Sequence, residues 1–435
     1  MPRTEYVRTT TILLCLALAA GSCGRHLSDA VSPGVNRSAS RATLEEGHGA
    51  HRVVVAMLAP GTVVGEDLTG LGGEIVEYRA AEGLVTLRPG PDMTDDDLMS
   101  ALAGDPRFVA FEPERWFETA ESRQRSFAFD DGLGSALTYA EQPAGRSIGL
   151  HRAHMASLGS GVRVAILDTG ADMTHPALQG AIVGGYDFVD FDPDPSDEAN
   201  GIDDDEDGFV DDAYGHGTHV AGIVHLAAPN AELLVVRVLD SEGRGSLLQV
   251  AAGVRWALTN GARVINLSLG SLGFSSTLEQ ALAEAEAQGV VVVTSAGNWG
   301  AEVPVEYPAS SPHVFAVAAV DTGGVPADFT SRGSFVALSA PGVGVRSAYP
   351  GGLYRLWSGT SMSAPFVAGS AALLLSQHPE WGLGDVRQQL SMTAGPVVDS
   401  PPNTMGAGRL DAGAAVAPML TSDEPEPQPD DIRPN

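Results

Sequence analysis

The stretch Ser358-Gly359-Thr360-Ser361-Met362-Ser363-Ala364-Pro365 runs directly into the apolar, helix-forming segment 366–375. This succession predicts a tight turn followed by a buried helix, with Ser361 at the mouth of the helix. There the serine hydroxyl can face a cleft, and the unpaired N–H groups of the first helical turn can stabilise a developing oxyanion. Taken alone, the stretch fits an ordinary helix cap better, so the rest of the chain decides between the two interpretations.

Around this stretch the chain alternates between apolar runs and helical patterns. Near-continuous apolar runs are typical of parallel strands that are buried on both faces. They lie at 162–167, 233–238, 264–267 and 290–293, and helical patterns at 247–259 and 276–288 separate the later ones. The alternation predicts an α/β fold, a doubly wound and mostly parallel sheet flanked by helices, with functional sites at the carboxyl ends of the strands.

A different pattern precedes this region. Thr94 is expected to cap a helix at 95–103, because three acidic residues follow it in the first turn. With a short connection near 67–71 in place of a first helix, the order of elements is β-α-β-β-α-β. We therefore expect a small α+β, ferredoxin-like domain before the main one, with strands at 53–58, 74–78, 84–87 and 108–111.

The composition of the 435 residues limits the classes of function. Hydrophobic residues make up 43%, which is enough for a globular core, and the formal net charge is −30. A protein this acidic is not expected to bind nucleic acid, because contacts with phosphates need lysine and arginine. The same charge suits an exposed, soluble surface and divalent cations.

The amino terminus has the layout of an export signal. Arg3 and Arg8 precede the apolar run 12–20, which is too short to span a bilayer. Cys23 directly follows Ala20-Gly21-Ser22, which is similar to a bacterial lipobox with alanine where leucine is usual. We expect an exported protein that is lipid-anchored at a bacterial cell envelope through Cys23; the alternative is a secreted protein with an ordinary signal peptide.

Three polar residues lie where sites of such a sheet are expected. Asp168 follows the apolar strand 162–167, and Asn298 comes just past the strand 290–293. His216 opens a helix between two glycines that permit close approach of a substrate backbone. His216 and His219 share a helix face and could form a metal pair, but no third ligand of the HExxH type accompanies them, so a general base is favoured.

Together with Ser361, these residues are the parts of a nucleophilic acyl-transfer site. Ser361 would attack a carbonyl, His216 would take and return the proton, and Asp168 would orient the imidazole. The side chain of Asn298 and the N–H of Ser361 would hold the oxyanion. The chain order and the lack of a Gly-x-Ser-x-Gly elbow disfavour an acyl-ester hydrolase, and the intact set of four residues disfavours a non-catalytic surface-binding protein.

In this order the motifs resemble those of the subtilisin-like serine proteases, the subtilases. The three catalytic motifs are Val164-Ala165-Ile166-Leu167-Asp168-Thr169-Gly170, His216-Gly217-Thr218-His219-Val220-Ala221-Gly222 and Gly359-Thr360-Ser361-Met362-Ser363-Ala364-Pro365. The resemblance covers about 148–416. It implies a serine endopeptidase that is made as a zymogen, with residues 51–114 as an inhibitory propeptide.

The resemblance also implies two edges that bind substrate. The strand at 268–270 would pair with the substrate backbone and line the S1 pocket, and 243–245 would form the opposite edge. A peptide would then bind as an added strand. Two departures from the family pattern, Ser271 and Trp299, leave the side-chain preference open. The residues implied to contact substrate are Ser268, Leu269, Gly270, Gly243 and Gly245.

The segment before His216 is the most acidic part of the chain. Within it, carboxylates at alternate positions followed by Gly208 match the first half of an EF-hand loop, whose oxygens suit Ca²⁺. The twelfth position is Tyr214 rather than a glutamate, so Asp211 or Asp212 must close the coordination shell. We expect a structural Ca²⁺ site, against the alternative of a solvated acidic loop, with the ligands Asp203, Asp205, Asp207 and Asp211.

These observations divide the chain into six expected segments. The segments are a signal peptide with lipobox (1–23), a tether (24–48), a propeptide domain (49–117), a linker (118–145), a peptidase domain (146–418) and a disordered acidic tail (419–435). Arg123 and Arg125 are candidate processing points in the linker.

We expect a monomer that cleaves protein or peptide substrates, is inhibited by its own propeptide and reaches a membrane through its lipid anchor.

Overall fold

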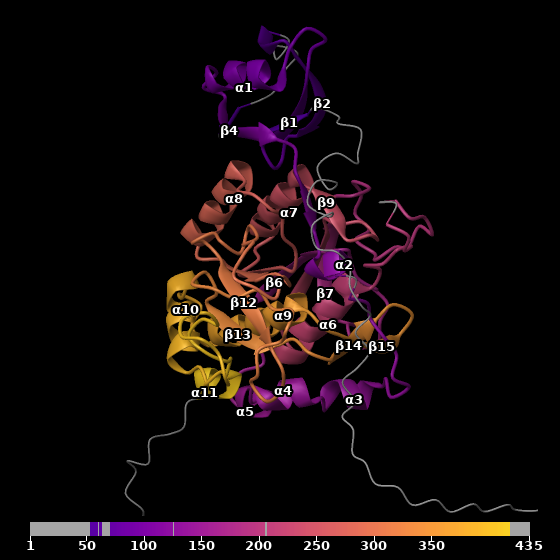
Figure 1. Ribbon diagram of the computed structural model, residues 1–435, viewed down its shortest axis with the longest axis vertical. Helices are drawn as coiled ribbons and strands as arrows, with labels where there is room; N and C mark the ends of the chain where they lie inside the picture. Colours follow the sequence, from indigo (N-terminus) through magenta and orange to yellow (C-terminus); the bar gives the residue numbers. More distant parts are fainter. Residues whose placement is uncertain (1–52, 60, 63–69, 125, 205–206, 418–435) are drawn as a thin grey trace, which may run out of the picture. The chain divides into compact units, whose positions relative to one another are not determined.

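The structure of the chain is a computed structural model that describes residues 53–59, 61–62, 70–124, 126–204 and 207–417 (Figure 1). The predicted signal peptide with Cys23, the predicted tether and the predicted acidic tail lie outside the described residues. Within the described part of the chain, no helix is long and apolar enough to cross a membrane.

A seven-stranded parallel sheet forms the centre of the larger part of the chain, in the order β13-β12-β11-β10-β6-β8-β7. The chain enters in the middle at β6, adds β7 and β8 on one side, and then crosses to build the other side from β10 onward. This confirms the predicted doubly wound fold, with its switch point between β6 and β10. The strands are β6 (Arg163–Asp168), β7 (Ile182–Asp187), β8 (Glu232–Arg237), β10 (Val264–Leu267), β11 (Val291–Ser295), β12 (Phe315–Val320) and β13 (Leu338–Pro341).

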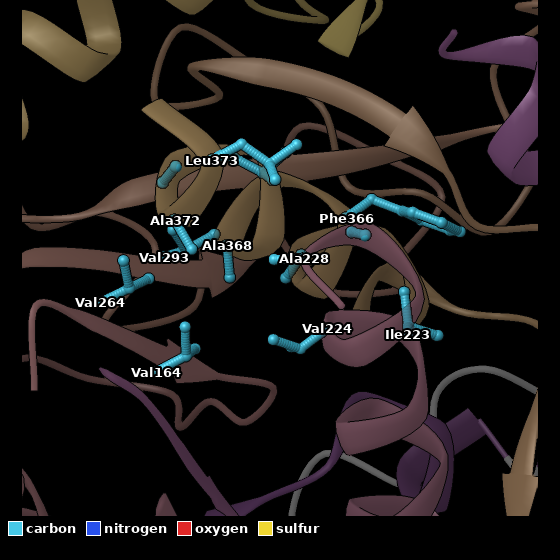
Figure 2. Packing of buried hydrophobic residues seen from close by; sticks show 14 of the residues in the cluster. Val164, Ile223, Val224, Ala228, Val264, Val293, Phe366, Ala368, Ala372 and Leu373 are labelled. Atoms are coloured by element: carbon cyan, nitrogen blue, oxygen red, sulfur yellow. The ribbon is translucent and has the colours of Figure 1, made fainter. Parts of the chain in front are cut away.

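Helices cover both faces of the sheet because successive side chains of each buried strand point to opposite faces. In β6, Val164 and Ile166 pack in the core with α6 and α9, whereas Ala165 and Leu167 pack with α7 and α8. Figure 2 shows the core that Val164 shares with α6 and α9. The helices are α6 (His216–Ala227), α7 (Leu247–Thr259), α8 (Ser276–Ala287), α9 (Thr360–Gln377), α10 (Leu383–Met392) and α11 (Ala412–Val416).

Helix α9 is the central element of the fold. Its residues 360–375 are all buried, and small side chains let it approach α6 closely. A Cβ on Gly369 would overlap the Ala227 side chain of α6. The predicted buried helix after Ser361 is therefore confirmed, and it extends for 18 residues.

The amino-terminal part is an antiparallel sheet in the order β2-β3-β1-β4, with one helix. Strand β3 lies between β1 and β2, as in a split β-α-β unit. One face of β1 packs on α1, whereas Val55 and Met57 on its other face join the core that contains α7 and α8. The predicted α+β fold of this part is confirmed. Its elements are β1 (Val54–Leu58), β2 (Gly73–Arg79), β3 (Leu84–Pro89), β4 (Phe108–Pro113) and α1 (Asp95–Ala103).

The segment at 118–145, for which we expected a linker, carries short folded elements. Each of its helices has five residues, too short to show the helical period in the sequence. Tyr139 donates its O–H to the carbonyl of Gly222 at 2.6 Å, and Gln142 bonds to the backbone of Arg346 through both side-chain atoms, at 2.7 and 3.1 Å. The elements in and next to this segment are β5 (Trp116–Glu118), α2 (Ala120–Gln124), α3 (Ala136–Ala140), α4 (Pro143–Ser147) and α5 (Leu150–His154).

Two further pairings complete the described structure. The hairpin β14 (Val345–Tyr349) and β15 (Leu353–Trp357) precedes α9. Strand β5 pairs with β9 (Arg244–Ser246), which comes just before α7. The second pairing joins the segment after the amino-terminal sheet to an edge that we expected to bind substrate.

Candidate active site

Asp168 ends β6 and His216 begins α6, and the structure brings the two side chains together. His216 Nδ1 lies 2.6 Å from Asp168 Oδ1, and both residues are buried. Gly215 has a φ of 88°, a left-handed value that favours glycine. A Cβ on Gly217 would overlap the carbonyl oxygen of Gly170. The glycines around His216 therefore allow the helix to begin directly against the end of β6.

His219 has other partners than this pair. Its Nε2 lies 3.1 Å from the carbonyl of Val345 and 3.2 Å from that of Arg355, and burial lowers its pKa to about 3. A neutral His219 with these partners has a structural role. In the described part of the chain, no group of three or more His, Cys, Asp or Glu residues is arranged to hold a metal ion. His216 and His219 therefore have different partners, a carboxylate and two backbone carbonyls.

Ser361 is the second residue of α9 and is fully buried. Pro365 lies four residues later and has no N–H, so the helix leaves the carbonyl of Ser361 without its usual partner. That carbonyl accepts a hydrogen bond from the hydroxyl of Ser268 at 3.1 Å instead. The proline thus links the backbone of the predicted nucleophile to the predicted substrate-binding strand.

Asn298 follows β11 and is oriented by α9. Its Oδ1 accepts hydrogen bonds from the N–H of Thr360 at 3.0 Å and from the hydroxyl of Thr360 at 2.9 Å. Because the carbonyl end of the amide is held in this way, the Nδ2 end points toward Ser361. Asn298 Nδ2 and the N–H of Ser361 donate to the same oxygen atom, at 2.9 and 3.4 Å, which is the arrangement expected of an oxyanion hole.

The oxygen that these donors share belongs to the side chain of Glu121, in α2. Its Oε1 accepts from Asn298 and from the Ser361 N–H, while its Oε2 lies 2.5 Å from Ser361 Oγ and 3.3 Å from His216 Nε2. Glu121 is fully buried. Its carboxylate therefore occupies the place between the imidazole, the hydroxyl and the oxyanion donors where a reacting carbonyl would lie.

Glu121 also changes the charge state of the site. Burial disfavours the imidazolium, but the charges and hydrogen bonds of Asp168 and Glu121 outweigh burial and raise the pKa of His216 well above its ordinary value. Burial likewise disfavours the Glu121 carboxylate, but hydrogen bonds from His216, Ser361 and Asn298 hold its pKa below the ordinary value. The result is an imidazolium between two carboxylates, and a protonated imidazole cannot act as a general base.

The segment before Glu121 lies along both predicted substrate-binding edges. Glu118 exchanges two backbone hydrogen bonds with Gly270, at 3.0 and 2.9 Å, and the N–H of Thr119 donates to the carbonyl of Gly243 at 3.0 Å. Phe117, which is fully buried, pairs with Gly245 and joins an apolar cluster. Residues 116–119 thus lie between the two edges as an added strand. The predicted residues Ser268, Leu269, Gly270, Gly243 and Gly245 all lie on these edges.

In the acidic loop, the predicted calcium ligands Asp203 and Asp211 have separate hydrogen-bond partners. Asp203 accepts hydrogen bonds from the N–H groups of Asp207 and of the following glycine, at 3.0 and 2.9 Å, in a tight turn. Asp211 instead accepts from the two N–H groups at 200–201, both at 2.8 Å. Asp205 lies outside the described residues. Asp203 and Asp207 lie in one turn, and the described carboxylates of this loop do not converge on a common point.

Sequence reasoning missed Glu121 and Glu306. Glu121 lies in a stretch with no periodicity, and nothing in the sequence signals that it reaches the catalytic residues. Glu306 directly precedes the motif Tyr307-Pro308-Ala309, which carries part of the family resemblance. Its place beside this motif is the one sequence feature that could have drawn attention to it. It is buried beside the substrate-binding edge at Gly270.

Comparisons with known proteins agree with this geometry. The profile of the subtilase family matches residues 159–411. Subtilisin BL from Lederbergia lenta is 42% identical over 266 residues, which are 59% of this chain and 91% of that protein. A thermostable alkaline protease from Halalkalibacterium halodurans is also 42% identical over 266 residues, 59% of this chain and 68% of that protein. Subtilisin E from Bacillus subtilis is 40% identical over 248 residues, 54% of this chain and 61% of that protein.

A solved structure extends the similarity beyond the matched region. The crystal structure of fervidolysin from Fervidobacterium pennivorans, a keratinolytic enzyme related to subtilisin, has a TM-score of 0.70 at 27% identity. The alignment covers 85% of this chain and 61% of fervidolysin. The chain therefore belongs to the subtilase family and is a subtilisin-like serine endopeptidase.

Proposed function

We propose that Asp168, His216 and Ser361 are the catalytic triad of this endopeptidase. Ser361 Oγ attacks the scissile carbonyl, His216 Nε2 accepts the proton and returns it to the leaving amine, and Asp168 holds the imidazole through Nδ1. The N–H of Ser361 and Nδ2 of Asn298 stabilise the oxyanion. Glu121 supports this assignment, because its carboxylate contacts His216 Nε2, Ser361 Oγ and both oxyanion donors at once.

The chain in this form is an inhibited precursor. Residues 116–119 lie in the substrate-binding edges, and Glu121 both fills the oxyanion hole and stabilises the protonated imidazole. Removal of this segment, by a cut within 118–145, would free the hole and lower the pKa of His216 toward its ordinary value. The peptidase domain at 146–418 would then be active, with residues 49–117 as its propeptide.

Labelling with a serine-directed fluorophosphonate tests both parts of this proposal. The mature chain should react, and Ser361→Ala should not; label that persists in Ser361→Ala would remove the nucleophile assignment. In the uncleaved precursor, resolved by size on a gel, Glu121→Ala should react at least about tenfold faster than the wild type, because it loses a charge-assisted contact to each group of the site. The exposed Glu141→Ala is the matched control and should label at the wild-type rate.

We also propose that the acidic loop binds a structural Ca²⁺ ion. Asp203 and Asp207, at the first and fifth positions of the loop, and the left-handed Gly208, with a φ of 94°, support this, since an EF-hand loop has oxygens and a glycine at these positions. When bound, the ion would offset the repulsion among the loop carboxylates. Addition of a chelator to the Ser361→Ala precursor should then lower its melting temperature and increase nicking near Asp203 by an added protease. If neither changes, the loop does not bind calcium.

For localisation we propose export and lipid attachment at Cys23, which rests on the sequence alone because this residue lies outside the described part of the chain. Metabolic labelling with a palmitate analogue should mark the wild type and not Cys23→Ala. A wild-type chain without label would favour the ordinary signal peptide and a secreted enzyme. We further propose that the enzyme is a monomer, which sedimentation of the Ser361→Ala precursor tests directly.

A further inference from the structure

Glu306 lies directly behind the substrate-binding edge. The residue after it, Tyr307, exchanges two backbone hydrogen bonds with Ser271, at 2.8 and 2.9 Å, which ties this segment to the end of the edge strand. Glu306 is 1% exposed. A Cβ on Gly270 would overlap its carboxylate, and a Cβ on Gly297 would lie 3.0 Å from its Cδ. The carboxylate therefore lies between the edge strand and the loop that carries Asn298.

The orientation of this carboxylate is held by Trp299. The indole Nε1 donates to Glu306 Oε1 at 2.7 Å, and the backbone N–H of Trp299 donates to the hydroxyl of Ser331 at 3.1 Å. Oε1 is thus directed at the indole, while Oε2 is the atom nearest to Gly270. Of the two departures from the family pattern, Trp299 contacts Glu306 directly, and Ser271 pairs with the backbone of the next residue, Tyr307.

A bound substrate would direct one side chain toward this carboxylate. Its backbone pairs with Gly270, as Glu118 does, and its scissile carbonyl lies between Asn298 Nδ2 and the N–H of Ser361. The residue that carries this carbonyl, P1, then has the edge strand on one side and the loop at 297–298 on the other. Both walls are glycine at the point of closest approach to Glu306, so no side chain of either wall separates P1 from its carboxylate.

We propose that Glu306 makes this enzyme selective for arginine or lysine at P1. The inference rests on the proposed active site and adds the class of substrate. A buried carboxylate that lies against the two glycine walls would form a charge-assisted hydrogen bond with a guanidinium or an ammonium group of P1. An apolar side chain would leave the carboxylate buried beside an apolar surface, and an acidic one would be repelled by it. The pocket thus selects by favouring a cation and by opposing the other classes.

Hydrolysis of fluorogenic peptides that differ only at P1 tests this inference. Mature wild-type enzyme should show a kcat/KM for arginine and lysine at least about tenfold above that for phenylalanine, leucine and glutamate. Glu306→Gln should lower kcat/KM for the arginine peptide by about 10-fold to 100-fold and change the phenylalanine peptide by less than about threefold, since only the cation loses a charged partner. Glu302→Gln removes the same charge from an exposed position and should keep the wild-type profile.

The outcomes separate this inference from the assignment of the active site. Fluorophosphonate labelling that is lost in Ser361→Ala establishes the site whatever the P1 profile is. If the labelled wild type cleaves phenylalanine or leucine peptides as well as arginine peptides, the role of Glu306 is wrong while the active site stands. If Glu306→Gln does not mature, the wild-type profile alone decides. A Glu306→Gln enzyme with unchanged preference for arginine would also overturn the inference.

Discussion

At the scale of single residues, the carboxylate of Glu121 has two oxygens that serve different halves of the site. Oε1 accepts hydrogen bonds from Asn298 Nδ2 and from the N–H of Ser361. Oε2 contacts the hydroxyl of Ser361 and the imidazole of His216. Without it, these buried donors would need water or substrate as partners. One side chain therefore both fills the proposed site and holds its donors in place.

The contribution of Asn298 can be measured by substitution. Removal of one oxyanion-hole donor from a subtilisin lowers kcat by roughly 10²–10³, and we expect Asn298→Ala to cause a loss of the same order in the mature enzyme with KM little changed. Asn230→Ala, at an exposed position, is the control. A kcat within about threefold of wild type, far from the loss expected for an oxyanion-hole donor, would contradict the assignment of Asn298.

At the scale of elements, the close contact of α9 with α6 holds two of the proposed catalytic residues on one rigid pair of helices. Ser361 lies near the start of α9 and His216 at the start of α6. Gly369 sets the distance between the helices because a larger residue would overlap Ala227. The geometry of the site thus depends on a contact that involves no catalytic residue.

We expect Gly369→Val to lower the free energy of unfolding by about 1–3 kcal/mol, because an overpacked core must shift to admit the side chain. Urea unfolding in a Ser361→Ala background, which prevents self-digestion, measures this. Gly384→Ala in α10 is the matched control: a Cβ there meets nothing within 4 Å, so the helix should gain about 0.5–1 kcal/mol. If Gly369→Val is as stable as the parent, the helices are not in close contact.

Two acidic residues of the amino-terminal part bind the first turns of peptidase helices. Glu112 accepts from the N–H of Thr277 at 2.7 Å at the start of α8, and Glu114 accepts from the N–H of Leu247 at 2.8 Å at the start of α7. Helix starts carry unpaired N–H groups and a partial positive charge, which carboxylates stabilise. These contacts couple the amino-terminal sheet to the peptidase helices.

The contribution of Glu114 to the free energy of unfolding should fall as the pH rises, because its ionised form is buried. Burial outweighs the hydrogen bonds from the helix and raises the pKa of Glu114 to about 7. Because the folded pKa exceeds the unfolded value of 4.5, the folded state favours the protonated form, and its stability falls as the pH rises through 4.5 toward 7.

Between about pH 5 and pH 8, the free energy of unfolding of the Ser361→Ala precursor should therefore fall by about 2–3 kcal/mol more than that of its Glu114→Gln variant. Urea unfolding at both pH values measures the difference. Glu74→Gln, an exposed position in β2, should keep the pH dependence of the parent. An equal loss in Glu114→Gln would show that Glu114 does not titrate in this range.

At the scale of the whole molecule, the doubly wound sheet brings distant segments to one place. The strand ends that carry Asp168 and Asn298 lie near the switch point between β6 and β10, and α9 adds Ser361 there. The sequence predicted these residues because each lies in a local motif beside a strong apolar run. It also predicted the parallel sheet, since fully buried strands read as continuous apolar runs.

The rest of the site could not be predicted from the sequence for a physical reason. Glu121 and Glu306 act through long-range contacts, and neither lies in a pattern of its own. The helices at 120–147 are too short to show a period, and they are held by single contacts such as Tyr139 to Gly222. Local patterns predict elements that are stable in themselves, whereas these pieces owe their place to the surface on which they lie.

Each turnover of the mature enzyme generates a peptide with a new terminal carboxylate, the same chemical group that Glu121 presents to the site. His216, Ser361 and Asn298 would offer that carboxylate the partners they offer Glu121. The enzyme should therefore suffer product inhibition by the amino-terminal fragment of its substrate. In progress curves, an added fragment should slow hydrolysis competitively, and amidation of its carboxyl terminus should weaken inhibition by at least about tenfold, because the charge is lost. Equal inhibition by the acid and the amide would show that the fragment is held by its backbone alone.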